Sequence, residues 1–443
     1  MKKPYGTLPG GASTNPAVWP FTIDIPEAEV ERMQTLVKLS PVASACFENS
    51  APDGDTDLGL SREWLVEAKR VWETDIDWKA LENEMNSFPH FKATVSVPEI
   101  SLPMKIHFMG MLSENPQATP IVLIHGWPGS FREFLPMLSL LRDQYPDPAQ
   151  LPYHIIVPSL PGYAFSDAFP NDRDHGIVDA ARVIDALAVQ ALGFRNYVVQ
   201  GGDIGSRVSR ILCAQYAECK AALLNFSPVP PPPSSDDAVG NSLNEAERRG
   251  LARADWFRSE GCAYALEQAT RPATVGLVLS SSPLALLAWI GEKFLEWTDP
   301  ASYPVDGVLP AGPTGREDAT TNNKTNKRYS TRLMRDILAS VSLYWLTGRA
   351  HTCLYSYRET FAIRGTPASS HGSPEYHVAP PKKLGFSSFP MEVMPTPRAW
   401  VAASGNLVFS RSHAKGGHFA AMEQPAAVLQ DLVDFVSLVL SSR

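Results

Sequence analysis

The stretch Gly201-Gly202-Asp203-Ile204-Gly205 decides the fold of this chain, because small residues flank a carboxylate directly after the apolar run Tyr197-Val198-Val199. The run predicts a buried strand, and the glycines suit a strained turn from a strand into a helix. This pattern is typical of a nucleophile elbow, with aspartate where esterases have serine. Attack by a carboxylate oxygen on a saturated carbon forms an alkyl ester that a second step must hydrolyse. Asp203 is the candidate nucleophile, and a plain surface turn is the alternative interpretation.

The composition is that of an ordinary globular chain of 443 residues, long enough for one large α/β domain with additions or for two to three domains. Its net charge of −8 and its lack of a basic run argue against a nucleic-acid partner. The five cysteines are scattered without CxxC spacing, so we expect neither a zinc site nor a disulfide framework. We see no signal peptide and no apolar run of the ~20 residues that cross a bilayer. We therefore expect a cytoplasmic protein without a transmembrane segment, and the sequence leaves open whether it is a homodimer.

Short apolar runs alternate with helical stretches from residue 121 onward, which predicts βαβ units and a mostly parallel sheet. The expected strands are 121–124, 154–157, 197–199 and, as the last, 399–403, and the expected helices are 131–141, 177–192 and 425–440. We therefore expect the α/β class.

Between about residues 228 and 389 the strand pattern is interrupted. The interval opens with the stiff linker Pro230–Pro233 and continues with helical stretches at 243–258, 284–297 and 331–347. We interpret it as a helical cap inserted into the core, with a long mobile loop at 301–330. The expected division is an N-terminal segment 1–110, a first core half 111–228, a cap 229–388 and a second core half 389–443.

The stretch His125-Gly126-Trp127-Pro128-Gly129 follows the first clear core strand, where an α/β-hydrolase has the loop that completes its oxyanion hole. The backbone N–H groups of Trp127 and Ile204 would then donate to the oxyanion that forms when water attacks the ester of Asp203. A plain strand end is the alternative interpretation.

The general base must follow the elbow in this fold, so the late histidines His413 and His418 are the candidates. His418 has two glycines before it and the start of a helix after it, which favours projection into a pocket. His413 lacks such a setting and is expected at the surface. Glu392 fits the chain order nucleophile, acid, base and would orient the imidazole of His418. A surface glutamate on a loop is an equally good interpretation of Glu392 by spacing alone.

Three motifs of this chain resemble those of the microsomal-type epoxide hydrolases, and especially those of their soluble fungal members. They are Gly-Gly-Asp-Ile-Gly-Ser at 201–206, His-Gly-Trp-Pro-Gly-Ser at 125–130 and Gly-Gly-His-Phe-Ala-Ala at 416–421. Residues 20–26 are similar to the family's amino-terminal segment, which wraps the core and contacts the cap. The resemblance implies an α/β-hydrolase fold with Asp203 as nucleophile, Glu392 as charge-relay acid and His418 as base.

The family also uses two cap tyrosines that hold the epoxide oxygen and protonate the leaving alkoxide. By resemblance these are Tyr264 and Tyr357, with Tyr355 as a nearby competitor. A phenol suits this task because its reference pKa of about 10 keeps it protonated at neutral pH.

The predicted activity is the opening of a small apolar epoxide by water to a vicinal diol, through an ester on Asp203 and without a cofactor or metal. One alternative is a haloalkane dehalogenase, which needs an N–H donor such as Trp after the nucleophile, where this chain has Ile204. A second is an epoxide-opening cyclase of fungal secondary metabolism, in which a substrate hydroxyl replaces water. A catalytically inactive binding protein is disfavoured, because nucleophile, base, acid and both tyrosines are present together.

Overall fold

The computed structural model describes residues 4–50, 58–232, 243–304, 330–363 and 370–441. Nine strands of this part of the chain form one sheet in the order β1-β2-β3-β5-β4-β6-β7-β8-β9. The strands are β1 Val18–Phe21, β2 His90–Val95, β3 Met104–Met111, β4 Thr119–Ile124, β5 Tyr153–Pro158, β6 Tyr197–Gly201, β7 Cys219–Leu224, β8 Lys383–Ser388 and β9 Leu407–Ser412. From β5 to β9 every neighbouring pair is parallel, whereas β1, β2 and β3 add an antiparallel edge.

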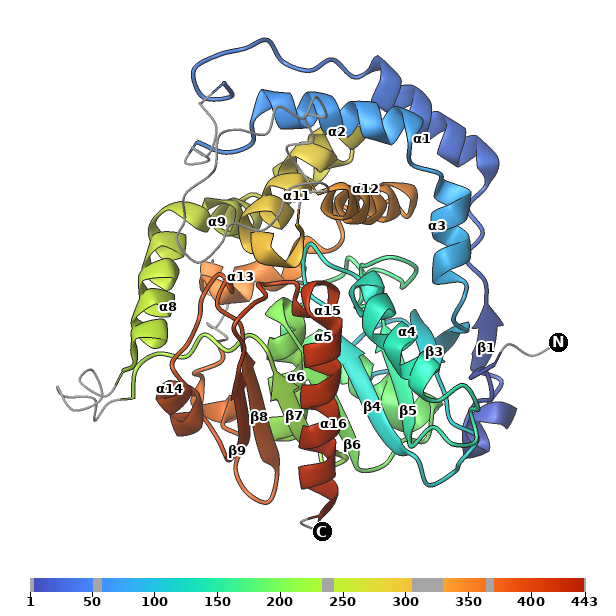
Figure 1. Ribbon diagram of the computed structural model, residues 1–443. Helices are drawn as coiled ribbons and strands as arrows, with labels where there is room; N and C mark the ends of the chain where they lie inside the picture. Colours follow the sequence, from blue (N-terminus) through green and yellow to red (C-terminus); the bar gives the residue numbers. More distant parts are fainter. Residues whose placement is uncertain (1–3, 51–57, 233–242, 305–329, 364–369, 442–443) are drawn as a thin grey trace.

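Helices cover both faces of the sheet, so its central strands are largely buried. All five residues of β6 are buried. One face packs against α4 (Leu135–Gln144) and α16 (Pro425–Ser441), and the other packs against α5 (Ile177–Ala186) and α6 (Asp203–Gln215) (Figure 1). This three-layer arrangement confirms the expected α/β fold with a mostly parallel sheet.

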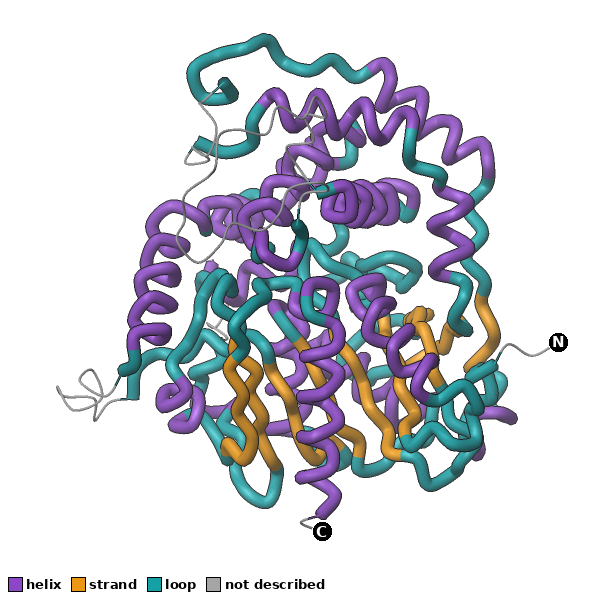
Figure 2. Tube along the Cα trace, viewed as in Figure 1, coloured by secondary structure: helices purple, strands orange, loops and turns teal. Residues whose placement is uncertain are grey.

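A second layer of helices lies above one end of the sheet (Figure 2). Between β7 and β8 the chain forms α8 Glu245–Trp256, α9 Ala263–Thr270, α10 Pro272–Leu279, α11 Pro283–Trp297, α12 Thr331–Leu346 and α13 Tyr357–Thr360. These helices include the three stretches predicted for the cap. The expected loop at 301–330 lies almost entirely outside the described residues.

The N-terminal segment connects the edge of the sheet to this helical layer. Its strand β1 pairs with β2, and its helices are α1 Glu27–Leu39, α2 Arg62–Thr74 and α3 Trp78–Met85. In α2, the buried Trp72 donates a hydrogen bond from Nε1 to Oγ of Ser342 in α12, at 3.0 Å. Among the described helices, none by itself has the length and apolar character of a membrane span.

The last predicted strand, 399–403, is wrong. These residues lie in helix α14, Arg398–Ala403, where three alanines favour a helix over a strand. The sheet instead resumes with β8 at Lys383, inside the segment 229–388 that was expected to be cap. β8 was missed because it contains a glycine and two serines. An added Cβ at Gly385 would approach side-chain atoms of Leu223 and Phe435 at 2.9 Å, so tight packing requires glycine there.

Candidate active site

Asp203 lies at the turn between β6 and α6, at the carboxyl end of the sheet. Its φ of +48° is in the left-handed region, which costs a non-glycine residue about 1 to 3 kcal/mol. The turn is closely packed, because a Cβ at Gly205 would lie 2.1 Å from the carbonyl oxygen of Ile124. Glycines beside Asp203 therefore allow this tight, strained turn. The structure has the strand-to-helix elbow that the sequence predicts.

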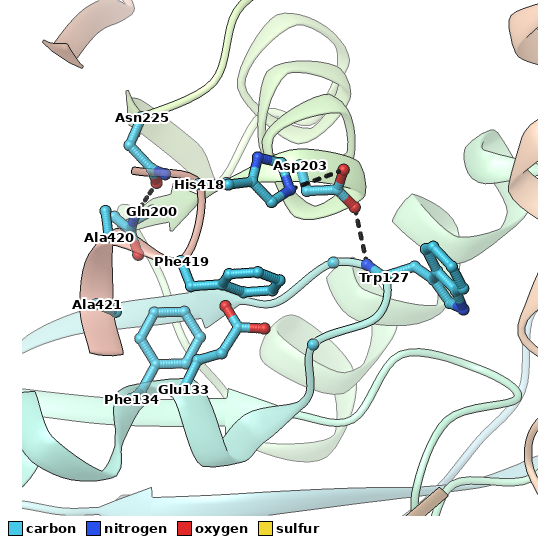
Figure 3. A pocket seen from close by; sticks show the side chains of 13 residues that line it. Trp127, Glu133, Phe134, Gln200, Asp203, Asn225, His418, Phe419, Ala420 and Ala421 are labelled. Atoms are coloured by element: carbon cyan, nitrogen blue, oxygen red, sulfur yellow. Dashed lines mark hydrogen bonds and ion pairs between the residues drawn. The ribbon is translucent and has the colours of Figure 1, made fainter. Parts of the chain in front are cut away.

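The loop after β4 supplies a donor to the carboxylate of Asp203. The backbone N–H of Trp127 donates to Oδ1 of Asp203 at 2.8 Å (Figure 3). A Cβ at Gly126 would lie 2.2 Å from the same oxygen, so only glycine allows this approach. The other expected donor, Ile204 N–H, lies in the first turn of α6, where N–H groups have no partner within the helix.

His418 lies between two carboxylates. Its Nδ1 is 2.5 Å from Oε1 of Glu392, and its Nε2 is 3.4 Å from Oδ2 of Asp203. Burial alone would lower the pKa of His418, but the negative charges of Glu392 and Asp203 and their hydrogen bonds outweigh it and hold this pKa well above 6.5. The surroundings of His418 therefore favour its protonated form.

The loop that carries His418 is fastened to the end of α11. The backbone N–H of His418 donates to the carbonyl oxygen of Trp297 at 2.9 Å. A Cβ at Gly417 would lie 2.5 Å from that same oxygen, which explains the glycine before the histidine. Glu423 accepts hydrogen bonds from the backbone N–H groups of Asp299 at 2.7 Å and of Phe419 at 3.0 Å. These bonds fix the imidazole relative to the helical layer.

The two predicted tyrosines come from α9 and α13 and meet beside Trp127. The ring centroids of Tyr264 and Tyr357 are 6.0 Å apart, and their distances to the Trp127 ring are 5.2 and 5.9 Å. Burial, together with the charge of Asp203, raises the pKa of Tyr264 well above 10, and burial raises that of Tyr357 as well. A hydrogen bond with the Tyr357 side chain lowers the pKa of Tyr264, but burial outweighs it. Both phenols therefore stay protonated and can donate to a ligand.

Two competing residues lie in other surroundings. Tyr355 packs edge-on against Phe169, with ring centroids 5.0 Å apart. Burial raises its pKa well above 10, with smaller contributions from Cys353, Glu359 and Asp179. His413 is not at the surface as predicted: its side chain is 15% exposed, and Nε2 lies 2.7 Å from Oδ2 of Asp431 in α16. The His413 ring is therefore paired with Asp431 and is not part of the lining of the pocket at Asp203.

A small cavity beside Asp203 and His418 contains polar residues that the sequence analysis missed. Its volume is about 20 Å³, and Glu133, Gln200 and Asn225 are in its lining (Figure 3). The sequence does hold a signal for Glu133, because Ser130 and Glu133 have the spacing of a helix capping box. That signal predicts a helix start, and it does not predict a pocket.

The parallel sheet, the strained elbow and the histidine paired with a glutamate define an α/β-hydrolase whose nucleophile position holds aspartate. Residues 119–259 match the family model described as alpha/beta hydrolase fold, and residues 18–134 match the one described as Epoxide hydrolase N terminus.

Relatives that match nearly the whole chain are also epoxide hydrolases by name. The solved structure of Aspergillus niger epoxide hydrolase is 42% identical, with a TM-score of 0.82 over 99% of this chain and 100% of that one. A Dothistroma septosporum protein named "Putative epoxide hydrolase" is 37% identical over 99% of this chain and 94% of its own. Epoxide hydrolase 1 of Oryctolagus cuniculus is 28% identical over 98% of this chain and 91% of its own. The chain belongs to the epoxide hydrolase family.

Proposed function

We propose that this enzyme converts an epoxide to a vicinal diol in two covalent half-reactions, with Asp203 as nucleophile. The observation that carries the proposal is the position of the Asp203 carboxylate, with Oδ1 held by the Trp127 N–H and Oδ2 next to His418. The oxygen held by Trp127 would become the ester carbonyl, and the other oxygen would attack.

In the first half-reaction, Oδ2 of Asp203 forms a bond to one epoxide carbon and the bond from that carbon to the ring oxygen breaks. Tyr264 and Tyr357 donate hydrogen bonds to the ring oxygen, and one phenol passes its proton to it. The aromatic surfaces of Trp127, Trp297 and the two tyrosines, which contact one another, favour a small apolar substrate.

Ester formation then prepares the base. The charge of Asp203 is one cause of the raised pKa of His418, and the ester carries no charge. The pKa of His418 therefore falls at this point. The imidazolium gives its proton to the phenolate, which becomes a neutral phenol again. The neutral imidazole, oriented by Glu392, is ready to accept a proton from water.

In the second half-reaction, water attacks Cγ of Asp203 while His418 takes a proton. The resulting oxyanion is stabilised by the N–H groups of Trp127 and Ile204. Collapse of this species breaks the bond between Cγ and Oδ2, and the product leaves as an alkoxide that carries the former Oδ2. This alkoxide takes the proton of the newly formed carboxylic acid. The products are the diol and the Asp203 carboxylate beside a protonated His418, as at the start.

A single turnover in water labelled with heavy oxygen tests the covalent route. The first diol should carry unlabelled oxygen from Asp203, and label should enter the diol only in later turnovers. Full labelling of the first diol would show direct attack by water. The same mass analysis separates hydrolysis from cyclisation, because a cyclic product has gained no water.

A further inference from the structure

The cavity beside the nucleophile has the size of one water molecule. Its volume of about 20 Å³ exceeds the roughly 10 to 15 Å³ that a water requires. Asp203 and His418, the groups that the water must reach, both line it. A water in this cavity would therefore be close to both the carbon to be attacked and the base.

Glu133 is the carboxyl group that completes this cavity. Its Oε1 accepts a hydrogen bond from the backbone N–H of Ser130 at 3.0 Å, and the carboxyl is directed into the pocket (Figure 3). A Cβ at Gly129 would lie only 1.3 Å from Oε1, so the glycine makes room for the carboxyl. The Tyr344 hydroxyl donates to the Gly129 carbonyl oxygen at 2.8 Å and holds this loop from α12.

Gln200, which also lines the cavity, offers a further acceptor. Nε2 of Gln200 donates to Oδ1 of Asn225 at 2.9 Å, which fixes the orientation of both amides. In this orientation, Oε1 of Gln200 is buried and has no hydrogen-bond partner among the described residues. A buried polar atom without a partner costs about 1 to 3 kcal/mol, and a water in this cavity would remove that cost.

We propose that Glu133 positions the water that hydrolyses the ester, an inference that rests on the covalent mechanism proposed above. The water oxygen bonds to Cγ of Asp203, one proton passes to Nε2 of His418, and the second hydrogen is directed to Glu133 and stays on the attacking oxygen. Glu133 takes no proton in this step. It aligns a lone pair of the water with the ester carbonyl carbon.

The surroundings of Glu133 agree with this role. Burial raises the pKa of Glu133 to about 8, the charge of His418 lowers it, and that of Asp203 raises it further. The carboxyl has an oxygen that accepts the hydrogen of the water whether it is ionised or protonated. In Glu133→Gln the amide oxygen must face the Ser130 N–H, so the amide N–H₂ faces the water and donates where the carboxyl accepts.

The test measures both half-reactions of the full-length enzyme with styrene oxide, by rapid quench and intact-protein mass. In Glu133→Gln, ester formation should keep its rate and ester hydrolysis should slow roughly 10- to 100-fold, as expected for a misoriented reactant. The ester should then accumulate during steady turnover. The matched control is Glu247→Gln, because Glu247 fills the same capping-box position in α8 without lining this cavity. It should leave both rates unchanged.

Hydrolysis at the wild-type rate in Glu133→Gln would overturn the inference, and so would equal slowing of both half-reactions, which indicates a structural role. If Glu133→Gln does not fold, Glu133→Asp decides by the same criteria, because its shorter side chain withdraws the carboxyl from the cavity. A wild-type enzyme that never forms an ester would instead refute the covalent mechanism, so the two failures are distinguishable.

Discussion

Replacement of His418 by glutamine should separate the two half-reactions more strongly than any other single change. Glutamine retains an N–H donor for Glu392, which lies 2.5 Å from the imidazole Nδ1 in the native site, so the buried carboxylate keeps a partner. It has no basic nitrogen, so nothing receives the proton from water. Asp203 and both tyrosines are untouched, and ester formation should proceed.

The size of the effect follows from what is removed. Loss of a general base costs roughly 10²- to 10⁴-fold, equivalent to about 2.7 to 5.4 kcal/mol in the barrier to ester hydrolysis. The barrier to alkylation should change far less, although Asp203 loses the cationic neighbour 3.4 Å from Oδ2 and becomes a somewhat better nucleophile. The ester should therefore accumulate to nearly one per enzyme.

Intact-protein mass after mixing with a reactive epoxide measures this directly. The mass of His418→Gln should rise by the mass of one epoxide and stay raised over many wild-type turnover times. Glu392→Gln is the graded comparison: it should slow hydrolysis less, because it weakens the support of the imidazolium but leaves the base in place. If His418→Gln remains unmodified while its circular dichroism is native, His418 is not the base that acts on the ester.

Three further outcomes are expected. Tyr264→Phe and Tyr357→Phe should each slow ester formation by roughly one to three orders of magnitude and the double variant by more, whereas Tyr355→Phe, which lies against Phe169, should not; a rapid-quench experiment that finds the reverse for Tyr355 and Tyr357 would exchange their roles. Gly126→Ala should reduce kcat about 100-fold with little loss of Tm, because its Cβ would displace Oδ1 of Asp203; unchanged kcat would contradict the close approach. His418 has a folded-state pKa above 6.5, so its contribution to stability is complete below that pH and is lost as the pH rises through the folded-state value; the Tm advantage of wild type over His418→Gln should shrink as the pH rises above 6.5, and a growing advantage would refute the sign.

The sequence predicted those parts of the site that depend on local chain geometry. The elbow at Asp203, the loop at Trp127 and the glycines before His418 are each encoded within a few residues, since a glycine stands wherever a Cβ would meet backbone or the nucleophile. By spacing alone, Glu392 could equally be the acid that orients His418 or a surface glutamate on a loop. Its 2.5 Å contact with His418 arises only when the fold brings together residues that are 26 positions apart. The choice of Tyr357 over Tyr355 required the family resemblance. The two tyrosines are only two residues apart, yet Tyr355 packs against Phe169 and Tyr357 packs against Trp127.

The errors in predicting the last strands of the sheet have a similar origin. The run at 399–403 is apolar enough for a strand, but its alanines favour helix, and β8 is recognisable only from its neighbours β7 and β9. Glu133 escaped notice because its capping bond to Ser130 is a sufficient local explanation for the residue. A carboxyl that serves a local turn and also faces a cavity can be identified only from the tertiary structure.

In the proposed mechanism, the arrangement of the site would also explain why one histidine serves after, and not before, the nucleophilic attack. The carboxyl groups of Asp203 and Glu392 beside His418 favour its protonated form, so that before alkylation it would not compete with the phenols as a base. Alkylation of Asp203 would remove one of those two charges, and the same imidazole would then accept a proton from water. The strained backbone of Asp203 and the hydrogen bond from Trp127 would keep the carbonyl group in one place during this change. The order of the two half-reactions would thus follow from the charge of Asp203 itself, with the His418 loop still held by Trp297 and Asp299.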